Sequence, residues 1–202
     1  MLYIEFYDRP AELLAPDLIG KKLVRLQNGR RLAGIITETE AYMGEGDLGS
    51  HAHFGKTKRN QVIFEKPGKA YVYFTYGMHW LFNIVSDSVG KAGAVLIRAV
   101  FPVEGLEIMA QNRPNLANSK QWLNGPAKLA QAFGLDGRMN GYDLTQPDGE
   151  LFLEEGISVP TDLVTVGPRV GLGKTPEPWN SIPLRWELGW EQVKELIQNG
   201  VK

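Results

Sequence analysis

An Asn-Gly pair between two strand-like segments indicates that the first two strands of this chain are antiparallel neighbours. Residues 22–26 and 32–42 carry apolar and β-branched side chains, and Gln27-Asn28-Gly29 separates them. Asn-Gly favours the positive backbone φ angles of the tight turns that join antiparallel strands. The two segments therefore predict a β-hairpin.

The rest of the chain predicts further strands mixed with a few helices. Strands are expected at 70–75, 81–86, 94–101 and 163–170, and helices at 10–18, 103–111, 126–133 and 190–198. Pro10 suits a first helical turn, and Gly134 and Gly200 follow the ends of the last two helices. This order lacks the regular alternation of a parallel doubly wound sheet, and the 202 residues contain no repeat or linker. We expect one mixed α+β domain spanning residues 1–202.

Composition excludes several classes of protein. Hydrophobic residues make up 43% and charged residues 22%, which is typical of a globular chain rather than a disordered one. The absence of cysteine excludes disulfides and thiolate chemistry. No apolar run approaches the ~20 residues of a membrane span, and the N-terminus lacks the layout of a signal peptide. We expect a cytoplasmic protein without a membrane partner.

Charge is uneven along the chain, although the formal net charge is only −1. The stretch from His51 to Trp80 holds one acid, Glu65, and five bases: Lys56, Lys58, Arg59, Lys66 and Lys69. A local excess of bases is compatible with a surface that binds nucleic-acid phosphates. It is also compatible with a solvated loop, and charge alone favours that plainer interpretation.

Two carboxylates and a phenol share one face of the predicted strand 32–42. Side chains alternate along a strand, so Glu38, Glu40 and Tyr42 lie on the same side. Such a face does not belong to an apolar core. It turns either toward solvent at a sheet edge or toward a polar pocket, and this stretch alone slightly favours solvent.

Residues 70–80 are unusually aromatic and contain a turn signal. Gly77 permits a turn directly after the predicted strand. Such a turn would project Tyr76, Met78 and His79 away from the sheet, where an aromatic side chain can act as a wedge between base pairs. The commoner arrangement is a hairpin whose aromatic side chains belong to the core.

The histidine pair His51 and His53 has the spacing that places two imidazoles on one face of a strand. That spacing allows a metal site. A third ligand with matching spacing is not evident, and the glycine-rich surroundings indicate a loop. We therefore expect no metal, and interpret His51 as a hydrogen-bond donor in a pocket.

Ten short segments, in order along the chain, match one known family. They are Glu38-Thr39-Glu40-Ala41-Tyr42, His51, Arg59-Asn60, Lys66-Pro67-Gly68, Tyr71-Val72-Tyr73, Tyr76-Gly77-Met78, Asn83-Ile84, Val95-Leu96-Ile97-Arg98-Ala99, Gly125-Pro126-Ala127-Lys128-Leu129 and Arg169-Val170-Gly171-Leu172-Gly173. With this set the chain resembles the alkyladenine (3-methyladenine) DNA glycosylase family. The resemblance implies an α+β domain with a curved, mainly antiparallel sheet and surrounding helices, and no metal or other cofactor.

The resemblance also implies roles for individual residues. Glu40 matches the general base that activates the attacking water. Arg98 and the backbone carbonyl of Val170 match groups that help to hold this water. Tyr76 matches a tyrosine inserted into DNA where the damaged nucleotide had been.

The remaining matches concern the base pocket and the DNA backbone. The pocket walls correspond to Tyr42, His51, Tyr73 and Asn83, the last of which disfavours normal guanine by crowding its amine. Candidates for contact with DNA beside the pocket are Arg59, Met78, His79 and Lys128. His79 stands where the better-known members have a tyrosine, so its own contact is left open.

The function that follows from the resemblance is removal of damaged purines from double-stranded DNA. The implied lesions are 3-methyladenine, 7-methylguanine, hypoxanthine and ethenoadenine, each flipped out before water hydrolyses its N-glycosidic bond. The pocket motifs contain no lysine nucleophile, so we expect a monofunctional enzyme that leaves an abasic site. We expect a monomer, associated with the nucleoid if the protein is bacterial.

Two other functions fit parts of the sequence. A non-catalytic damaged-DNA-binding module would keep the bases and Tyr76, but it would not need Glu40 and Arg98. A hydrolase of free nucleosides would use Glu38 and Glu40, but it would need neither the local bases nor the projecting tip.

Overall fold

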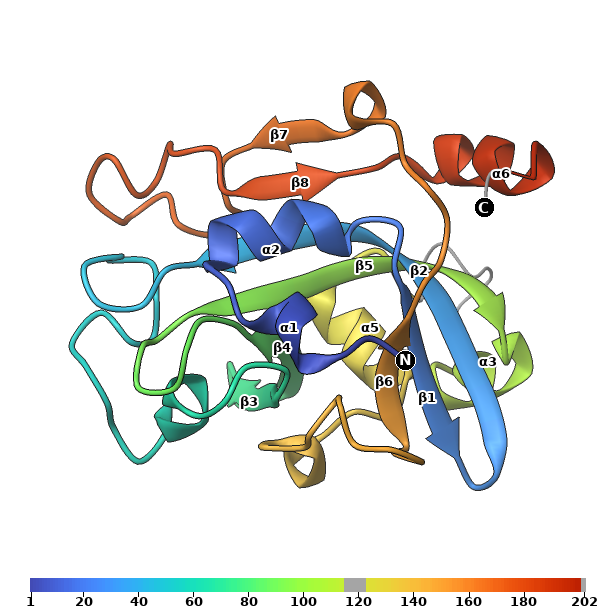
Figure 1. Ribbon diagram of the computed structural model, residues 1–202, viewed down its shortest axis with the longest axis horizontal. Helices are drawn as coiled ribbons and strands as arrows, with labels where there is room; N and C mark the ends of the chain where they lie inside the picture. The colour runs from blue at the N-terminus through green and yellow to red at the C-terminus, as the bar shows by residue number, and fades with distance from the viewer. Residues whose placement is uncertain (115–122, 201–202) are drawn as a thin grey trace.

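The computed structural model describes residues 1–114 and 123–200, and a curled eight-stranded antiparallel sheet dominates this part of the chain (Figure 1). The strands are β1 (Lys22–Gln27), β2 (Arg30–Tyr42), β3 (Ala70–Thr75), β4 (His79–Val85), β5 (Ala94–Glu104), β6 (Leu151–Glu154), β7 (Thr165–Gly167) and β8 (Arg185–Glu187). Their order is β3-β4-β5-β2-β1-β6, and β8 pairs with both β2 and β7. The predicted α+β class and antiparallel sheet are confirmed.

Short helices surround the sheet. They are α1 (Ile4–Tyr7), α2 (Ala11–Leu18), α3 (Leu106–Asn112), α5 (Pro126–Ala132) and α6 (Trp190–Gln198), with 3₁₀ turns η1 (Gln61–Phe64), η2 (Gly137–Met139) and η3 (Thr161–Leu163). Within residues 1–114 and 123–200, none of the helices has both the length and the apolar character that crossing a membrane requires.

The predicted hairpin is confirmed as β1 and β2. Gln27 pairs with Arg30, and the two residues between them, Asn28 and Gly29, have φ angles of 52° and 74°. Positive φ at both positions is the signature of a type I′ turn, whose twist matches that of the strands. The long strand β2 then continues into the centre of the sheet, where it pairs with β5 and β8.

The two faces of β2 have different surroundings. On one face lies α2, whose Ala15 carbonyl accepts a hydrogen bond of 2.9 Å from the buried hydroxyl of Thr39. Helix α5 packs on β4 and β5, and Figure 1 shows it behind the sheet when α2 lies in front. Because side chains alternate along a strand, Glu40 points away from α2 and toward the α5 side.

Several predicted boundaries are wrong for identifiable reasons. The expected strand 163–170 ends at Gly167, because the next residue, Pro168, has no N–H to donate to a strand ladder. The expected helix from Val103 begins only at Leu106, because β5 runs on to Glu104 and Gly105 then turns the backbone with a φ of 73°. Strands β6 and β8 were not predicted, since segments of three or four residues carry little periodicity.

Candidate active site

A cavity of about 390 Å³ lies on the α5 side of the sheet. Its lining includes Tyr42, His51, Tyr71, Tyr73, Tyr76, His79, Asn83, Arg98, Pro126, Ala127 and Val170. The wall therefore includes four tyrosine rings and two imidazoles, together with aliphatic side chains and a few polar groups. This composition is typical of a site that encloses a flat organic ligand.

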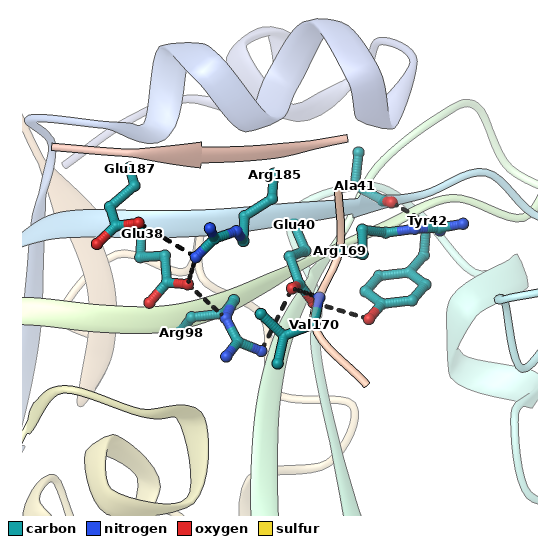
Figure 2. Close-up of polar contacts among 9 residues, drawn as sticks. All are labelled: Glu38, Glu40, Ala41, Tyr42, Arg98, Arg169, Val170, Arg185 and Glu187. Atoms are coloured by element: carbon teal, nitrogen blue, oxygen red, sulfur yellow. Dashed lines mark hydrogen bonds and ion pairs between the residues drawn. The ribbon is translucent and has the colours of Figure 1, made fainter. Parts of the chain in front are cut away.

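Glu40 lies directly behind the cavity wall with its side chain fully buried. Figure 2 shows its carboxylate between Arg98, Val170 and Tyr42. One carboxylate oxygen accepts a 2.6 Å hydrogen bond from the backbone N–H of Val170, and the other a 2.8 Å bond from the hydroxyl of Tyr42. The Arg98 guanidinium approaches the first oxygen at 3.4 Å. These three neighbours all line the cavity. The alternative of a solvent-facing strand is wrong for Glu40.

The surroundings of Glu40 and Arg98 raise the pKa of both groups. Burial raises the pKa of the Glu40 carboxyl above its usual 4.5, although Arg98, the Val170 amide and the Tyr42 hydroxyl each oppose that rise. Burial lowers the pKa of Arg98, but Glu40 and Glu38 more than reverse this and raise it. The site therefore combines a permanent cation with a carboxylate of increased basicity.

A buried ion pair fixes the segment that carries Val170. The guanidinium of Arg169 binds both carboxylate oxygens of Asp47, at 2.6 and 2.8 Å, and both side chains are fully buried. It also donates to the carbonyl of Ala41 at 3.0 Å, and it lies 4.7 Å from the centre of the Tyr42 ring. This pair, the Asp47–Arg169 clamp, ties two loops to the end of β2 beside Glu40.

No role was predicted for Arg169, although it lies in one of the matching segments, and none was predicted for Asp47. The signal available was a basic residue between Pro168 and Val170, but nothing local identifies its acidic partner, which lies 122 residues away.

The aromatic wall is formed by two tyrosines and a histidine. Tyr71 and Tyr73 are stacked with their ring centres 5.2 Å apart, and His51 meets the Tyr73 ring edge-on at 4.5 Å. Nδ1 of His51 lies 3.1 Å from the Tyr71 hydroxyl. Desolvation, together with the charges of Arg59 and His53, lowers the pKa of His51, so the imidazole is neutral at pH 7. Burial raises the pKa of Tyr71 to about 12, so its phenol is neutral as well.

The two histidines make separate contacts in a loop. Nδ1 of His53 lies 2.6 Å from the carbonyl of Ser50, whereas His51 faces the tyrosines. No cluster of three or more His, Asp or Glu side chains in the described part of the chain has the arrangement of a metal site. Deeper in the cavity, Asn83 donates a 3.1 Å hydrogen bond to the carbonyl of Tyr71, which fixes its amide at the wall.

The β3–β4 turn presents exposed side chains at the rim of the cavity. Tyr76 is 87% exposed and has a φ of 52°, followed by Gly77 at 68°. For a residue with a Cβ, this left-handed conformation costs about 1–2 kcal/mol. Met78 and His79 are exposed beside it. The tip therefore carries a large, unburied aromatic side chain on a strained backbone, so the core interpretation is wrong for Tyr76.

Two of the five bases in the 51–80 stretch are neutralised within the fold. Lys66 pairs with Asp143 and Lys69 pairs with Glu65, each at 2.5 Å. Among the described residues, Lys56, Lys58 and Arg59 have no acidic partner within ion-pair distance. Three cations therefore remain on the loop after His51.

The other predicted DNA contacts lie around the same opening. Arg59 donates to the carbonyl of Phe74 at 3.2 Å, which ties the basic loop to β3. Lys128 lies in the first turn of α5, next to the cavity-lining residue Ala127, and donates to Asn124 at 2.9 Å. The structure thus brings the predicted residues together around one cavity.

Comparison with known proteins agrees with this geometry. The sequence profile described as methylpurine-DNA glycosylase matches residues 5–191. The chain belongs to this family. It is 46% identical over 169 residues to a protein of Carboxydothermus hydrogenoformans named as a 3-methyladenine DNA glycosylase, covering 83% of this chain and 86% of that protein.

Two further relatives carry the same name. One, from Chlorobaculum parvum, is 44% identical and aligns over 87% of this chain and 83% of its own length. The other, from Methanocella arvoryzae, is also 44% identical, over 87% of this chain and 88% of its own. The family predicted from the short motifs is confirmed, and with it the prediction of a DNA repair glycosylase.

The Asp47–Arg169 clamp should dominate stability around the site. Asp47→Asn leaves a fully buried guanidinium without its counter-ion, and breaking such a pair costs about 3–5 kcal/mol. We expect a loss of that size in the free energy of unfolding, measured by urea denaturation. Glu155→Gln removes an exposed partner of Lys21 and should change it by less than about 1 kcal/mol. Equal effects of the two substitutions would contradict the clamp.

Proposed function

We propose that this glycosylase takes alkylated purines, flipped out of duplex DNA, into the aromatic cavity and hydrolyses their N-glycosidic bond with water. The observation that carries the proposal is the position of Glu40, buried behind that cavity and held by Arg98, Tyr42 and the amide of Val170. Hypoxanthine and ethenoadenine are part of the proposed range. The enzyme is monofunctional and leaves an abasic site.

In this mechanism Glu40 is the general base. Cleavage passes through a sugar with oxocarbenium character, and a nearby carboxylate both stabilises this cation and removes a proton from water. Arg98 lines the cavity and keeps Glu40 ionised. This mechanism requires water to approach Glu40 between Tyr42, Arg98 and Val170, the three neighbours of the carboxylate that line the cavity. The amide of Val170 binds Glu40, and we keep the role of its carbonyl in holding water as a prediction.

The cavity wall suits a cationic base. An alkylated purine such as 3-methyladenine carries positive charge, so it leaves without a strong protein acid. The electron-rich faces of Tyr71 and Tyr73 attract such a ring by cation–π interaction, worth roughly 1–2 kcal/mol when water is excluded. The neutral imidazole of His51 adds no repelling charge. Asn83, fixed at the wall, is our candidate for excluding guanine.

The rim supplies the groups for holding DNA. Extrusion of a nucleotide costs a few kcal/mol of stacking and pairing, and the flat ring of Tyr76 offsets part of this cost when it enters the gap. Met78 and His79 follow Tyr76 and Gly77 along the chain and are also exposed. Arg59 and Lys128 are proposed contacts to phosphates around the opening.

These features favour the glycosylase over a non-catalytic DNA-binding module and over a hydrolase of free nucleosides. A pure binding module gains nothing from a buried carboxylate beside Arg98, since burying charge is costly. A nucleoside hydrolase gains nothing from a strained, exposed Tyr76. Steep weakening of duplex binding with salt separates the enzyme from this second alternative. A monomeric state, a cytoplasmic location and independence from metal or other cofactors stay predictions from the sequence.

Glu40→Gln tests the proposed base. This variant keeps the shape of the side chain but cannot accept the proton, so we expect single-turnover excision of 3-methyladenine from a duplex to fall about 10²–10⁴-fold. Binding of the same duplex should persist. Abasic sites are detected by alkaline cleavage, with Glu45→Gln, an exposed carboxylate, as the matched control. Near-normal turnover by Glu40→Gln would contradict its role as the general base. A covalent adduct trapped by borohydride would contradict the attack by water.

The pH dependence of excision should report Glu40. The carboxylate must be ionised to act as a base, so the rate falls as pH drops through its pKa, which burial raises above 4.5. We expect an acid limb centred above this value in single-turnover rates on 7-methylguanine, whose positive charge does not change over the acid range. Tyr42→Phe removes a hydrogen bond that lowers this pKa and should shift the limb to higher pH. A shift to lower pH would contradict the assignment.

Tyr76→Ala tests the wedge. Loss of a stacking ring costs about 1–3 kcal/mol per base, so excision from a duplex should weaken about tenfold or more. Activity on a single-stranded lesion should be largely retained, because no neighbouring stack has to be replaced. Tyr3→Ala removes another highly exposed tyrosine, outside both the cavity lining and the basic loop, and is the control. Equal loss on both substrates would refute the wedge.

A further inference from the structure

The Arg98 side chain is shared between two carboxylates (Figure 2). Its Nε donates to Glu38 at 2.7 Å, and its Nη1 lies 3.4 Å from Glu40. The shorter contact is therefore made to Glu38, the carboxylate that has no part in the proposed proton transfer. Because Nε is bound to Glu38, the plane of the guanidinium is fixed, and its terminal nitrogens are left for Glu40 and the cavity.

The sheet itself is irregular at this point. Glu38 pairs with Ala99 and the next residue, Thr39, pairs with Ile97, so the register skips Arg98. A bulge of this kind redirects the side chain of the extra residue. Arg98 thus leaves the regular ladder where both Glu38 and Glu40 are within its reach.

Strand β8 holds Glu38 from the other side. Arg185 donates to the same oxygen of Glu38 at 2.9 Å and to Glu187 at 3.1 Å. In the β2–β8 register Glu187 lies opposite Glu38, and two like charges in that position repel each other. Arg185 bridges them, which keeps the Glu38 carboxylate in place between two guanidinium groups.

We propose that Glu38 is a positioning residue for base excision, which orients Arg98 toward Glu40 while Arg185 holds Glu38 against β8. This inference rests on the proposed role of Glu40. The chain of contacts from Arg185 through Glu38 and Arg98 to Glu40 is continuous, and the side chains of Glu38 and Arg98 are only 12% and 13% exposed along it. Glu38 also offsets the charge of Arg98, so that Glu40 keeps its basicity beside a cation.

Glu38→Gln removes the charge and keeps the size of the side chain. We expect single-turnover excision, measured well below the melting temperature of the variant, to fall about 10–100-fold with affinity for a lesion duplex nearly unchanged. The melting temperature should fall, because Arg98 and Arg185 lose a shared, largely buried counter-ion. The acid limb of the rate should move to lower pH, because Arg98 then acts on Glu40 without an opposing charge. Glu187→Gln, at the exposed outer end of the same network, is the matched control and should stay within about twofold of the parent.

Glu38→Asp separates position from charge. It keeps the carboxylate but withdraws it from Nε of Arg98, so the rate should fall while the acid limb stays in place. It also keeps the test open if Glu38→Gln folds poorly. With Arg98→Ala as the background, adding Glu38→Gln should cause no further loss, since Glu38 acts through Arg98.

The outcomes separate this proposal from the proposed function. Parent-like rates in both Glu38 variants, or full additivity with Arg98→Ala, overturn the positioning role. If Glu40→Gln is defective in the same assay, the proposed mechanism still stands. An active Glu40→Gln variant instead overturns the mechanism itself. A rate loss in Glu38→Gln that follows only a fall in melting temperature, without a shift of the acid limb, also overturns the positioning role.

Discussion

The carboxylate of Glu40 sits inside the protein, where an isolated charge costs several kcal/mol of lost hydration. Its two oxygens are satisfied by a phenol, a backbone amide and a guanidinium. These come from β2 itself, from the segment after β7 and from β5. Segments far apart in the sequence must therefore meet at one point of the sheet, and the cavity forms where they meet.

Two supports keep those partners in place. The Asp47–Arg169 clamp fixes the residue before Val170, and β8 places Arg185 against Glu38, which in turn binds Arg98. Each support is an ion pair that is buried or nearly so, where charges interact more strongly than at the surface. The groups around Glu40 are thus held by ion pairs inside the fold, whereas Tyr76 at the rim is exposed.

Sequence alone was sufficient for features with local causes. Asn28-Gly29 predicted the first hairpin, and the helix predicted over 190–198, with Gly200 just past its end, is α6 with the same bounds. The grouping of Glu40, Arg98 and Val170 came from family resemblance, and the structure places these three in contact. The roles assigned to them still need the experiments above.

Other features depend on contacts that no local pattern contains. Strand β8 has three residues and exists because β2 offers it an edge. The partner of Arg169 lies 122 residues earlier in the chain. The solvent alternative for Glu40 was favoured because alternation identifies a shared face, but it does not reveal whether that face meets water or a wall.

The left-handed backbone at Tyr76 lowers the stability of the fold but presents the side chain that the proposed action on duplex DNA needs. Glycine or asparagine would relax this turn, because both tolerate the left-handed conformation better than a tyrosine does. A population of variants chosen only for heat resistance would therefore drift away from the aromatic side chain. Keeping it requires selection on intact duplexes, so thermal screens used to engineer this enzyme must be paired with a repair assay.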